Sequence, residues 1–421
     1  MMTLKNTPLI FGLSLIFSTS TAIAQTPLPK DMPTRAEMWQ MILHQQEQIK
    51  KLETIVGITT EKVAETEKKI EATGEILDQV ALSGGLETPH GNSGATTVGG
   101  YAELHYNGGK KDQIDQHRFV IFLGHEFSDK IRFYSELEVE HAISGSGEVG
   151  AVEMEQAFVE FDLSERHRAS VGMQLVPVGI INETHEPPTF YGVERNNVEK
   201  NIIPTTWREA GVMLSGNLND SFSYDVMMHS GLDTTGYGYK IRKGRQQVGN
   251  APWKNTAVTT RVKWHGLPGV KIAASFQYQD DITQSGGIDE KATATLFEIN
   301  SEINRAVSEN SAFGLRALYA QWNVRADAAR RLGRNIQRGW YVEPSYKITL
   351  DENNAIGFFA RYSLWDNEAG DNIDSSFHQT TLGVSYWPHE NVILKLDYQI
   401  DNFANSLQED NRVNLGLGLQ F

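Results

Sequence analysis

The 421-residue chain contains no cysteine, 37 glycines and 13 prolines, and its formal net charge is −15. The missing cysteine excludes disulfide frameworks, thiolate metal sites and cysteine nucleophiles, and the negative charge argues against a general affinity for nucleic acid. The mean hydropathy is −0.38, and no apolar run approaches the ~20 residues that a membrane-spanning helix needs. A membrane β-barrel is compatible with this composition, because only alternate residues of its strands face lipid.

Residues 1–24 are typical of a secretory signal peptide. Lys5 provides the positive charge, Leu9–Phe17 forms the apolar core, and Ala22–Ala24 is the small-residue cleavage site before Gln25. The apolar core is too short to span a membrane as a helix. The mature protein is therefore expected outside the bacterial cytoplasm.

Residues 25–82 predict a periplasmic coiled coil that joins several copies of the chain. Apolar side chains recur at every seventh residue, which places them along one seam of a helix, and Lys, Glu and Gln occupy the outer faces. β-branched residues at this seam do not decide between two and three strands, and a single helix lying on the barrel is the alternative. The predicted seam consists of Ile42, Ile49, Val56, Val63, Ile70 and Leu77.

A flexible linker is expected over residues 83–96, where glycines and Pro89 interrupt any regular pattern. Residues 97–421 then predict a transmembrane antiparallel β-barrel of about 16 strands, so the fold class is all-β after an N-terminal coiled-coil helix. Sixteen segments have roughly the length of a tilted spanning strand, and an even number suits a single-chain barrel. The predicted strands are 97–107, 115–126, 130–143, 152–163, 166–174, 208–216, 221–230, 256–265, 269–280, 290–303, 311–322, 337–347, 354–365, 375–387, 391–401 and 410–421.

The alternation of side chains is clear in the last strand, where Val413, Leu415, Leu417 and Leu419 share one face. This face is expected to contact lipid, and the small or polar face between them to contact a wet lumen. The pattern leaves the facing of the second and fourth strands open. Short and long connections alternate, as periplasmic turns and external loops do. Aromatic residues near strand ends are expected to form interfacial girdles: Tyr106, Trp264, Trp322, Trp340, Trp365 and Trp387.

The connection Leu175–Trp207 is the candidate functional segment. Loops of this length are usually functional or disordered, and its prolines and apolar residues indicate an ordered loop. We expect it to fold into the bore and narrow it, as the equivalent loop of a trimeric porin does. The alternatives are an external flap or a loop packed on a neighbouring subunit. An inward fold would bring these residues to the pore: Glu183, His185, Glu186, Glu194, Arg195, Glu199 and Lys200.

Charged residues at lumen-facing positions fall into two groups. Acidic residues occupy the first, third and fourth predicted strands, and basic residues occupy later strands. Opposed walls would create a transverse field that orients charged solutes; the alternative is that these charges pair across strands. The acidic wall is Glu103, Glu136, Glu138, Glu140 and Glu160, and the basic wall is Arg261, Lys263, Arg316, Lys347, Arg361 and Lys395.

Three further motifs give weaker indications of function. Two basic segments could guide anions or bind lipopolysaccharide phosphates, or they could form solvated surfaces. They are the arginines between Arg325 and Arg338 and the run Lys240–Arg245. Gly145–Gly150 matches Gly-x-Gly-x-x-Gly but joins two β segments, so no nucleotide site is expected. His185–Pro188 lacks the second histidine of a zinc motif, and the chain shows no nucleophile elbow. We expect no catalytic residue, no cofactor and no metal.

The chain resembles the outer-membrane porins described as phosphate-selective porin O/P-like, over roughly Thr97–Phe421. The resemblance implies a sixteen-stranded trimeric channel, often with an N-terminal coiled coil. Its basic residues do not match a phosphate-binding ladder one by one, so a carboxylate-like anion fits as well as phosphate. The residues that carry the resemblance are Val176–Gly179, His185–Arg195 and Ile203–Val212, supported by Gly99–His105 and Glu136–His141.

The expected function is passive diffusion of small hydrophilic, anionic solutes through the bacterial outer membrane, without catalysis. The expected partners are membrane lipid, lipopolysaccharide and two further copies in a homotrimer, with no nucleic acid. The first alternative is an adhesin or structural tether that uses the barrel as an anchor, and the second is an outer-membrane hydrolase. Stepwise conductance in a planar bilayer would favour the channel, a silent bilayer the tether, and ester turnover the hydrolase.

Overall fold

The computed structural model describes residues 39, 45–46, 48–50, 94–144, 148–285 and 290–421. The predicted signal peptide, most of the predicted linker and nearly all of the predicted coiled coil lie outside these residues. Of the heptad seam only Ile49 is described, and it is helical, so the coiled coil stays a prediction. Nowhere in the described part of the chain is a helix both long enough and apolar enough to cross a membrane.

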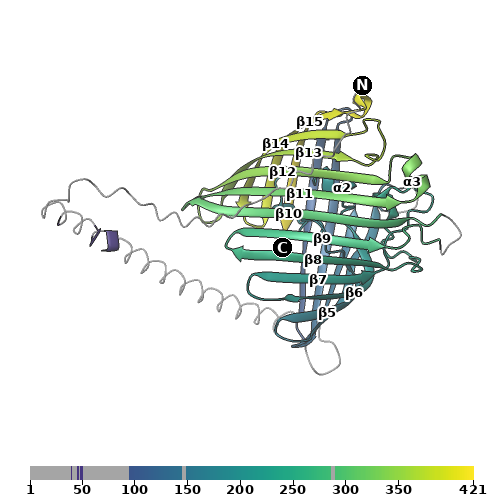
Figure 1. The fold of residues 1–421 in the computed structure, drawn as a ribbon. Coiled ribbons are helices and arrows are strands. Elements are labelled where there is room, and N and C mark those ends of the chain that lie inside the picture. The colour runs from purple at the N-terminus through teal and green to yellow at the C-terminus, as the bar shows by residue number, and fades with distance from the viewer. Residues whose placement is uncertain (1–38, 40–44, 47, 51–93, 145–147, 286–289) are drawn as a thin grey trace, which may run out of the picture. The chain divides into compact units, whose positions relative to one another are not determined.

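Sixteen antiparallel strands close into one barrel within the described residues, which confirms the predicted all-β barrel. Each strand pairs with its neighbours in sequence, and β1 (Thr96–Gly108) pairs with β16 (Arg412–Gln420) to complete the ring. Figure 1 shows the strands side by side in chain order. The others are β2 (Gln113–Ser128), β3 (Ile131–Glu140), β4 (Ala151–Asp162), β5 (His167–Leu175), β6 (Arg208–Asn217), β7 (Phe222–His229), β8 (Ala257–Leu267), β9 (Val270–Gln279), β10 (Thr293–Ser308), β11 (Ser311–Arg325), β12 (Ile336–Thr349), β13 (Ala355–Asp366), β14 (Phe377–His389) and β15 (Val392–Phe403).

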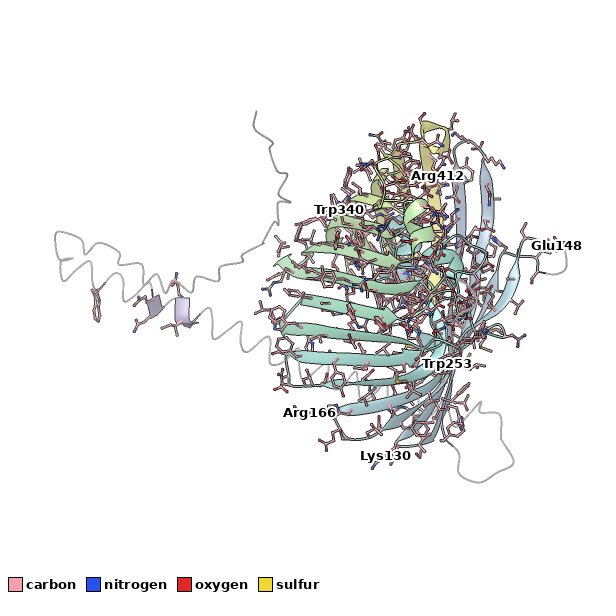
Figure 2. The ribbon with its side chains drawn as sticks, turned by 45° about the vertical axis from the view of Figure 1, so that its right-hand side comes forward. Lys130, Glu148, Arg166, Trp253, Trp340 and Arg412 are labelled. Atoms are coloured by element: carbon pink, nitrogen blue, oxygen red, sulfur yellow. The ribbon has the colours of Figure 1, made fainter. Side chains whose placement is uncertain are left out.

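Short turns join the strands at one end of the barrel and longer loops join them at the other. Lys130 and Arg166 lie in short turns, and Glu148 and Trp253 lie in long loops toward the opposite end (Figure 2). The loops also contain short helical segments, which are η1 (Pro187–Thr189), α2 (Asn197–Asn201), η2 (Ile241–Gly244), α3 (Asp327–Arg331) and η3 (Ser406–Gln408).

Side chains alternate between an apolar outer surface and a polar interior. In β9, Phe276 and Tyr278 are 47% and 42% exposed on the outside, whereas Gln277 and Gln279 are fully buried inside. A soluble sheet with such an outer face would aggregate, but the same face is stable in hydrocarbon. The outer surface of the barrel therefore suits a membrane.

Strands β2 and β4 carry a bulge each, which explains why the sequence pattern left their facing open. In β4, Met154 and Gln156 pair with successive residues of β3, so Glu155 is an extra residue; His117 is extra in β2 in the same way. One inserted residue reverses the parity of all positions beyond it. Met154 before the bulge and Phe161 after it are accordingly both exposed outside, although one number is even and the other odd.

The predicted aromatic girdle is wrong for three of its tryptophans. Trp322, Trp365 and Trp387 are at most 5% exposed and face the interior: the indole N–H of Trp322 donates to the carbonyl of Ile202 at 2.9 Å. Proximity to a strand end does not decide which face a side chain takes, because facing depends on parity. Trp340, which is 37% exposed, lies on the outer surface.

Candidate functional site

The long connection between β5 and β6 lies inside the barrel. At one side the hydroxyl of Thr206 donates to Glu155 of β4 at 2.8 Å. On the opposite wall, eight strands away, the hydroxyl of Tyr341 of β12 donates to Glu199 of the loop at 2.6 Å. The backbone N–H of Val193 donates to Asp397 of β15 at 2.7 Å. Contacts to opposite walls are possible only for a loop that crosses the bore, so residues 176–207 form an inward loop rather than an external flap.

An apolar cluster fixes the inward loop in the polar interior. Its side chains from the loop include Val178, Ile202 and Trp207, and those from the wall include Trp322 and Tyr341, all at most 3% exposed. Burial of each large apolar side chain contributes about 1.5–3 kcal/mol. Several such contributions together stabilise the packed position of the loop, so protein occupies part of the bore.

Glu199 is a structural carboxylate inside the loop rather than a pore charge. It is completely buried, and its Oε2 accepts the N–H groups of Ile180 and Ile181 at 2.8 and 2.7 Å. Its Oε1 accepts the hydroxyl of Tyr341 at 2.6 Å. Burial raises the pKa of Glu199, and these hydrogen bonds only partly oppose that effect. The sequence pattern predicted this residue at the pore. In the structure it instead fixes the loop to β12 through Tyr341.

Glu183 and Glu194 lie closer to the water-filled part of the bore. Glu183 is 37% exposed and pairs with Arg261 of β8. Glu194 accepts a hydrogen bond from Asn107 at 3.1 Å and lies 3.4 Å from His105. Burial alone would raise the pKa of Glu194, but the hydrogen bond and charge of His105 outweigh it and hold that pKa well below its usual range. The other predicted loop residues are Glu186 and Arg195, both half-buried, and Lys200, which is exposed.

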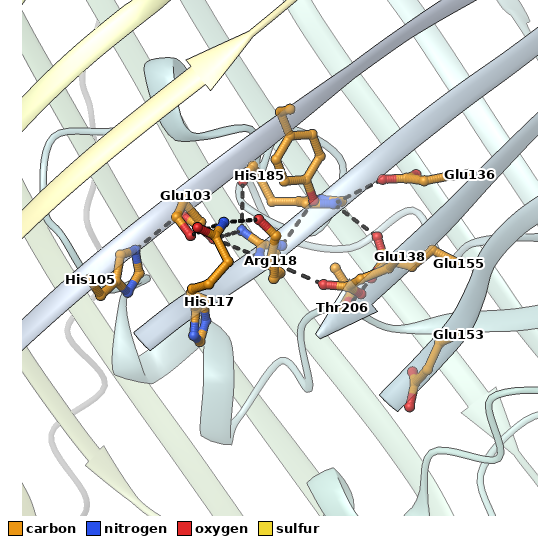
Figure 3. Close-up of polar contacts among 12 residues, drawn as sticks. Glu103, His105, His117, Arg118, Glu136, Glu138, Glu153, Glu155, His185 and Thr206 are labelled. Atoms are coloured by element: carbon orange, nitrogen blue, oxygen red, sulfur yellow. Dashed lines mark hydrogen bonds and ion pairs between the residues drawn. The ribbon is translucent and has the colours of Figure 1, made fainter. Parts of the chain in front are cut away.

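His185 joins the loop to the acidic side of the wall. Its Nε2 lies 3.6 Å from Glu136 Oε1 and 3.3 Å from Glu155 Oε2, and all three side chains are at most 3% exposed (Figure 3). Burial alone would lower the pKa of His185, but the two carboxylates outweigh burial and raise it to about 10. Among the lumen-facing groups, Glu155 was missed by sequence analysis because the bulge in β4 conceals its facing.

The remaining acidic wall residues are largely paired. Arg118 of β2 pairs with Glu103 and lies 3.7 Å from Glu138. Arg132 contacts Glu160 at 3.0 Å. Glu140 is half-buried at the loop end of β3.

The basic wall residues are also engaged. Arg261 and Lys263 share Asp225 at 2.7 and 2.9 Å, and Lys395 donates to the carbonyl of Gly192 at 2.8 Å. Such pairs leave little uncompensated field, so the observed contacts favour pairing over two opposed charged walls. The remaining contacts are Arg316 with Glu302 and Arg361 with Glu343, both at 3.2 Å, and Lys347 over the ring of Trp387 at 4.3 Å.

A second long loop, residues 230–256, brings two arginines onto the inward loop. Arg242 donates to the carbonyls of Lys200 and Thr205 at 2.8 and 2.7 Å, and Arg245 donates to the carbonyl of Thr206 at 2.9 Å. Burial, followed by the charge of Arg245, lowers the pKa of Arg242 to about 10. From the sequence these arginines were predicted either to guide anions or bind lipopolysaccharide, or to lie on a solvated surface. Their contacts with the backbone of the inward loop are visible only in the tertiary structure.

Lys200, Arg242 and Arg245 together form the loop-side basic cluster. The surrounding protein lowers the pKa of Lys200 although its side chain meets water; Glu194 opposes this, and Arg242, Arg412 and Arg245 add to it. Burial is the largest cause of this lowered pKa, and among the charged neighbours of Lys200 three arginines oppose one carboxylate. The local potential at this cluster is therefore positive.

Two cavities open on the turn side of the inward loop. The first, of about 440 Å³, has Lys271, Arg316 and Lys347 in its lining against Glu302 and Glu343. The second, of about 450 Å³, has four basic side chains in its lining, Arg132, Arg166, Arg168 and Lys263, against Asp162, Glu165 and Asp225. Each lining therefore carries one more basic than acidic residue (three against two, and four against three).

Residues 97–421 match the family described as phosphate-selective porin O and P. The chain belongs to this family. A relative, an uncharacterized protein of Aquifex aeolicus (strain VF5), is 28% identical over 354 residues, which cover 75% of this chain and 77% of that protein. This porin is accordingly a channel-forming barrel of the outer membrane.

Solved structures share the fold at low identity. The outer membrane channel DcaP of Acinetobacter baumannii has a TM-score of 0.51 and 13% identity, over 80% of this chain and 99% of that one. The trimer form of OmpT, an outer membrane protein of Vibrio cholerae, has a TM-score of 0.50 and 11% identity, over 78% of this chain and all of that one. At these identities the likeness concerns the fold alone.

Proposed function

We propose that this porin is a passive channel that prefers small anions, such as phosphate or carboxylates, over cations and catalyses no reaction. The observation that carries the proposal is the loop-side basic cluster, in which Lys200 belongs to the loop that narrows the bore and Arg242 and Arg245 contact that loop from the 230–256 loop. A positive potential at a constriction attracts anions and repels cations. The paired wall charges contribute less, because each is neutralised at short range.

The exposed Lys200 is the best position for a test of ion preference. Lys200→Glu reverses one charge at the cluster, which changes the energy of a nearby ion by on the order of 1 kcal/mol, or roughly fivefold in permeability ratio. The measurement is the reversal potential of single channels in a salt gradient at low ionic strength, where screening is weak. Lys243→Glu is the matched control, because Lys243 is an exposed lysine of the 230–256 loop.

We expect Lys200→Glu to move the reversal potential toward cation preference and Lys243→Glu to leave it nearly unchanged. Equal reversal potentials for the wild type and Lys200→Glu would remove the cluster from the selectivity mechanism. Block of current by phosphate and by a dicarboxylate, compared at equal charge, then ranks the two solute classes.

We also propose that the porin is a homotrimer embedded in membrane lipid and lipopolysaccharide, with a cleaved signal peptide and a periplasmic coiled coil. The heptad seam from Ile42 to Leu77 supports the coiled coil, and the trimer form described for the similar barrel from Vibrio cholerae supports three copies. Native mass in detergent is the test. A full-length porin that runs as a monomer at every detergent concentration contradicts the trimer.

A further inference from the structure

Three ligand-type atoms converge between the wall and the inward loop without a hydrogen-bond partner. They are Glu136 Oε1, Glu155 Oε2 and His185 Nε2, and each is unpartnered and inaccessible to water among the described residues. All three lie within 4.8 Å of one another, and Figure 3 shows His185 reaching toward the two carboxylates. Buried polar atoms are normally satisfied, so three such atoms aimed at one point indicate an additional occupant.

Hydrogen bonds hold the two carboxylates in this orientation. Gln156 donates to Glu136 Oε2 at 2.8 Å, and Thr206 donates to Glu155 Oε1 at 2.8 Å. In each carboxylate one oxygen is therefore fixed by a neighbour while the other points to the shared space. Metal sites are built in this way, with second partners that orient the liganding groups.

The imidazole is oriented in the same manner. His185 Nδ1 lies 3.2 Å from the carbonyl oxygen of Asn182. A carbonyl only accepts, so Nδ1 carries the hydrogen, and the lone pair of the neutral ring lies on Nε2. That lone pair points at the two carboxylates, which is the arrangement of a metal-binding histidine with a backbone partner.

The charge balance around His185 requires more positive charge than its imidazole supplies. Five carboxylates contact Arg118, Arg208 or His185, against two guanidinium groups; with Glu138 taken as protonated, two negative charges remain (four minus two). A proton on His185 cancels one of these charges, whereas a divalent cation cancels two. Buried charge that is not compensated is strongly unfavourable. The five carboxylates are Glu103, Glu136, Glu138, Glu153 and Glu155.

We propose that Glu136, Glu155 and His185 bind one divalent transition-metal ion, of which zinc is the best match. Tetrahedral ligands at about 2.0–2.1 Å from zinc lie roughly 3.3 Å apart, and the observed nitrogen–oxygen separations are 3.3 and 3.6 Å. An imidazole favours zinc and similar ions over magnesium or calcium.

The ion would tie the inward loop to two adjacent strands. Glu136 belongs to β3, Glu155 is the bulge residue of β4, and His185 belongs to the loop. The bulge lets the consecutive residues Glu155 and Gln156 both face the lumen beside Glu136, whereas a regular strand would turn one of them outward. Zinc would thus hold the inward loop against β3 and β4. This inference is independent of which solute the channel prefers.

The test uses the full-length porin in detergent, stripped with a chelator, re-equilibrated with zinc and analysed for bound metal by mass spectrometry. We expect one tightly bound zinc ion per chain, at least tenfold weaker in Glu136→Gln and in His185→Gln. His105→Gln is the matched control, because His105 is also buried in the lumen against carboxylates but lies outside the cluster. It should keep the zinc ion.

Folding is checked independently by heat-modifiable migration of each variant. A folded wild type that binds no zinc, or variants that bind it as tightly as the wild type, would overturn the proposal and leave a protonated His185 as the occupant. X-ray absorption at the zinc edge gives a second readout. One imidazole nitrogen with oxygen ligands supports the site, and an all-oxygen shell contradicts it.

Discussion

Asn182 and Trp207 close the base of the inward loop by hydrogen bonds in both directions. The backbone N–H of Trp207 donates to Asn182 Oδ1 at 2.6 Å, and Asn182 Nδ2 donates to the carbonyl of Trp207 at 3.1 Å. The same Nδ2 also donates to the carbonyl of Val176 at 2.8 Å. One buried side chain thus joins the two ends of a segment that crosses the bore.

Asn182→Ala should loosen the loop without opening the barrel. The carbonyls of Val176 and Trp207 keep backbone donors after this change, but the N–H of Trp207 loses its acceptor, which costs about 1–3 kcal/mol. We expect larger fluctuations of single-channel current and faster proteolysis of the loop in detergent. Asn353→Ala, at an exposed turn position, is the control. Current noise that matches the wild type would show that the apolar cluster alone holds the loop.

Glu183→Gln should increase the preference for anions. Glu183 is partly exposed and pairs with Arg261, which also contacts Asp225 at 2.7 Å. Loss of one negative charge therefore leaves Arg261 less compensated at the bore, while Asp225 keeps it in place. The reversal potential in a salt gradient is the measurement, with the exposed turn residue Glu352 changed to Gln as control. A shift toward cations would contradict this description of the bore.

Glu199→Gln should alter the dependence of the porin's stability on pH. The folded-state pKa of Glu199 is raised above its ordinary value by burial, so the folded protein binds this proton more tightly than the unfolded chain does. The stabilisation from this proton is complete below the ordinary pKa and is lost as pH rises through the raised pKa. Denaturant unfolding in detergent should show this fall in the wild type.

In Glu199→Gln the same pH interval should show no such fall from this position, because the amide does not titrate. At low pH the variant should be about as stable as the wild type, because glutamine resembles the protonated carboxyl. Its oxygen accepts the N–H groups of Ile180 and Ile181, and its amide N–H can donate to the hydroxyl of Tyr341. Parallel curves for the two proteins across the interval would refute the assignment of this pH dependence to Glu199.

A quencher in the lipid should reduce the fluorescence of Trp340 much more than that of Trp322. Trp322 is completely buried and donates to Ile202 inside the barrel, whereas Trp340 is exposed outside. In brominated lipid, Trp340→Phe should remove much of the quenched fluorescence and Trp322→Phe should remove little of it. Trp322→Phe should also lower the free energy of unfolding by about 1–3 kcal/mol, because the carbonyl of Ile202 loses its partner. Equal quenching losses would contradict the facing described above.

Local sequence predicted the barrel because apolar and polar side chains alternate along each membrane-spanning strand. Ile272, Phe276 and Tyr278 alternate with polar residues in the sequence and face outward in the structure. The alternation did not predict which face each residue takes around His117 and Glu155. At each of these bulges one extra residue exchanges the inward and outward positions that follow. A switch in the parity of apolar residues within one strand was the available signal. Trp322 shows the second limit, since an aromatic near a strand end can face either way.

The sequence by itself determined the strand number, the order of the strands, and which connection is long enough to reach into the bore. These features depend on neighbours in the chain, through alternation, turn length and loop length. Only the tertiary structure decided that Glu199 fixes the loop to β12, that Arg242 and Arg245 contact the inward loop, and that His185 meets Glu136 and Glu155. Those contacts join residues far apart in sequence. Their formation depends on how the loop packs inside a closed barrel, which no local pattern contains.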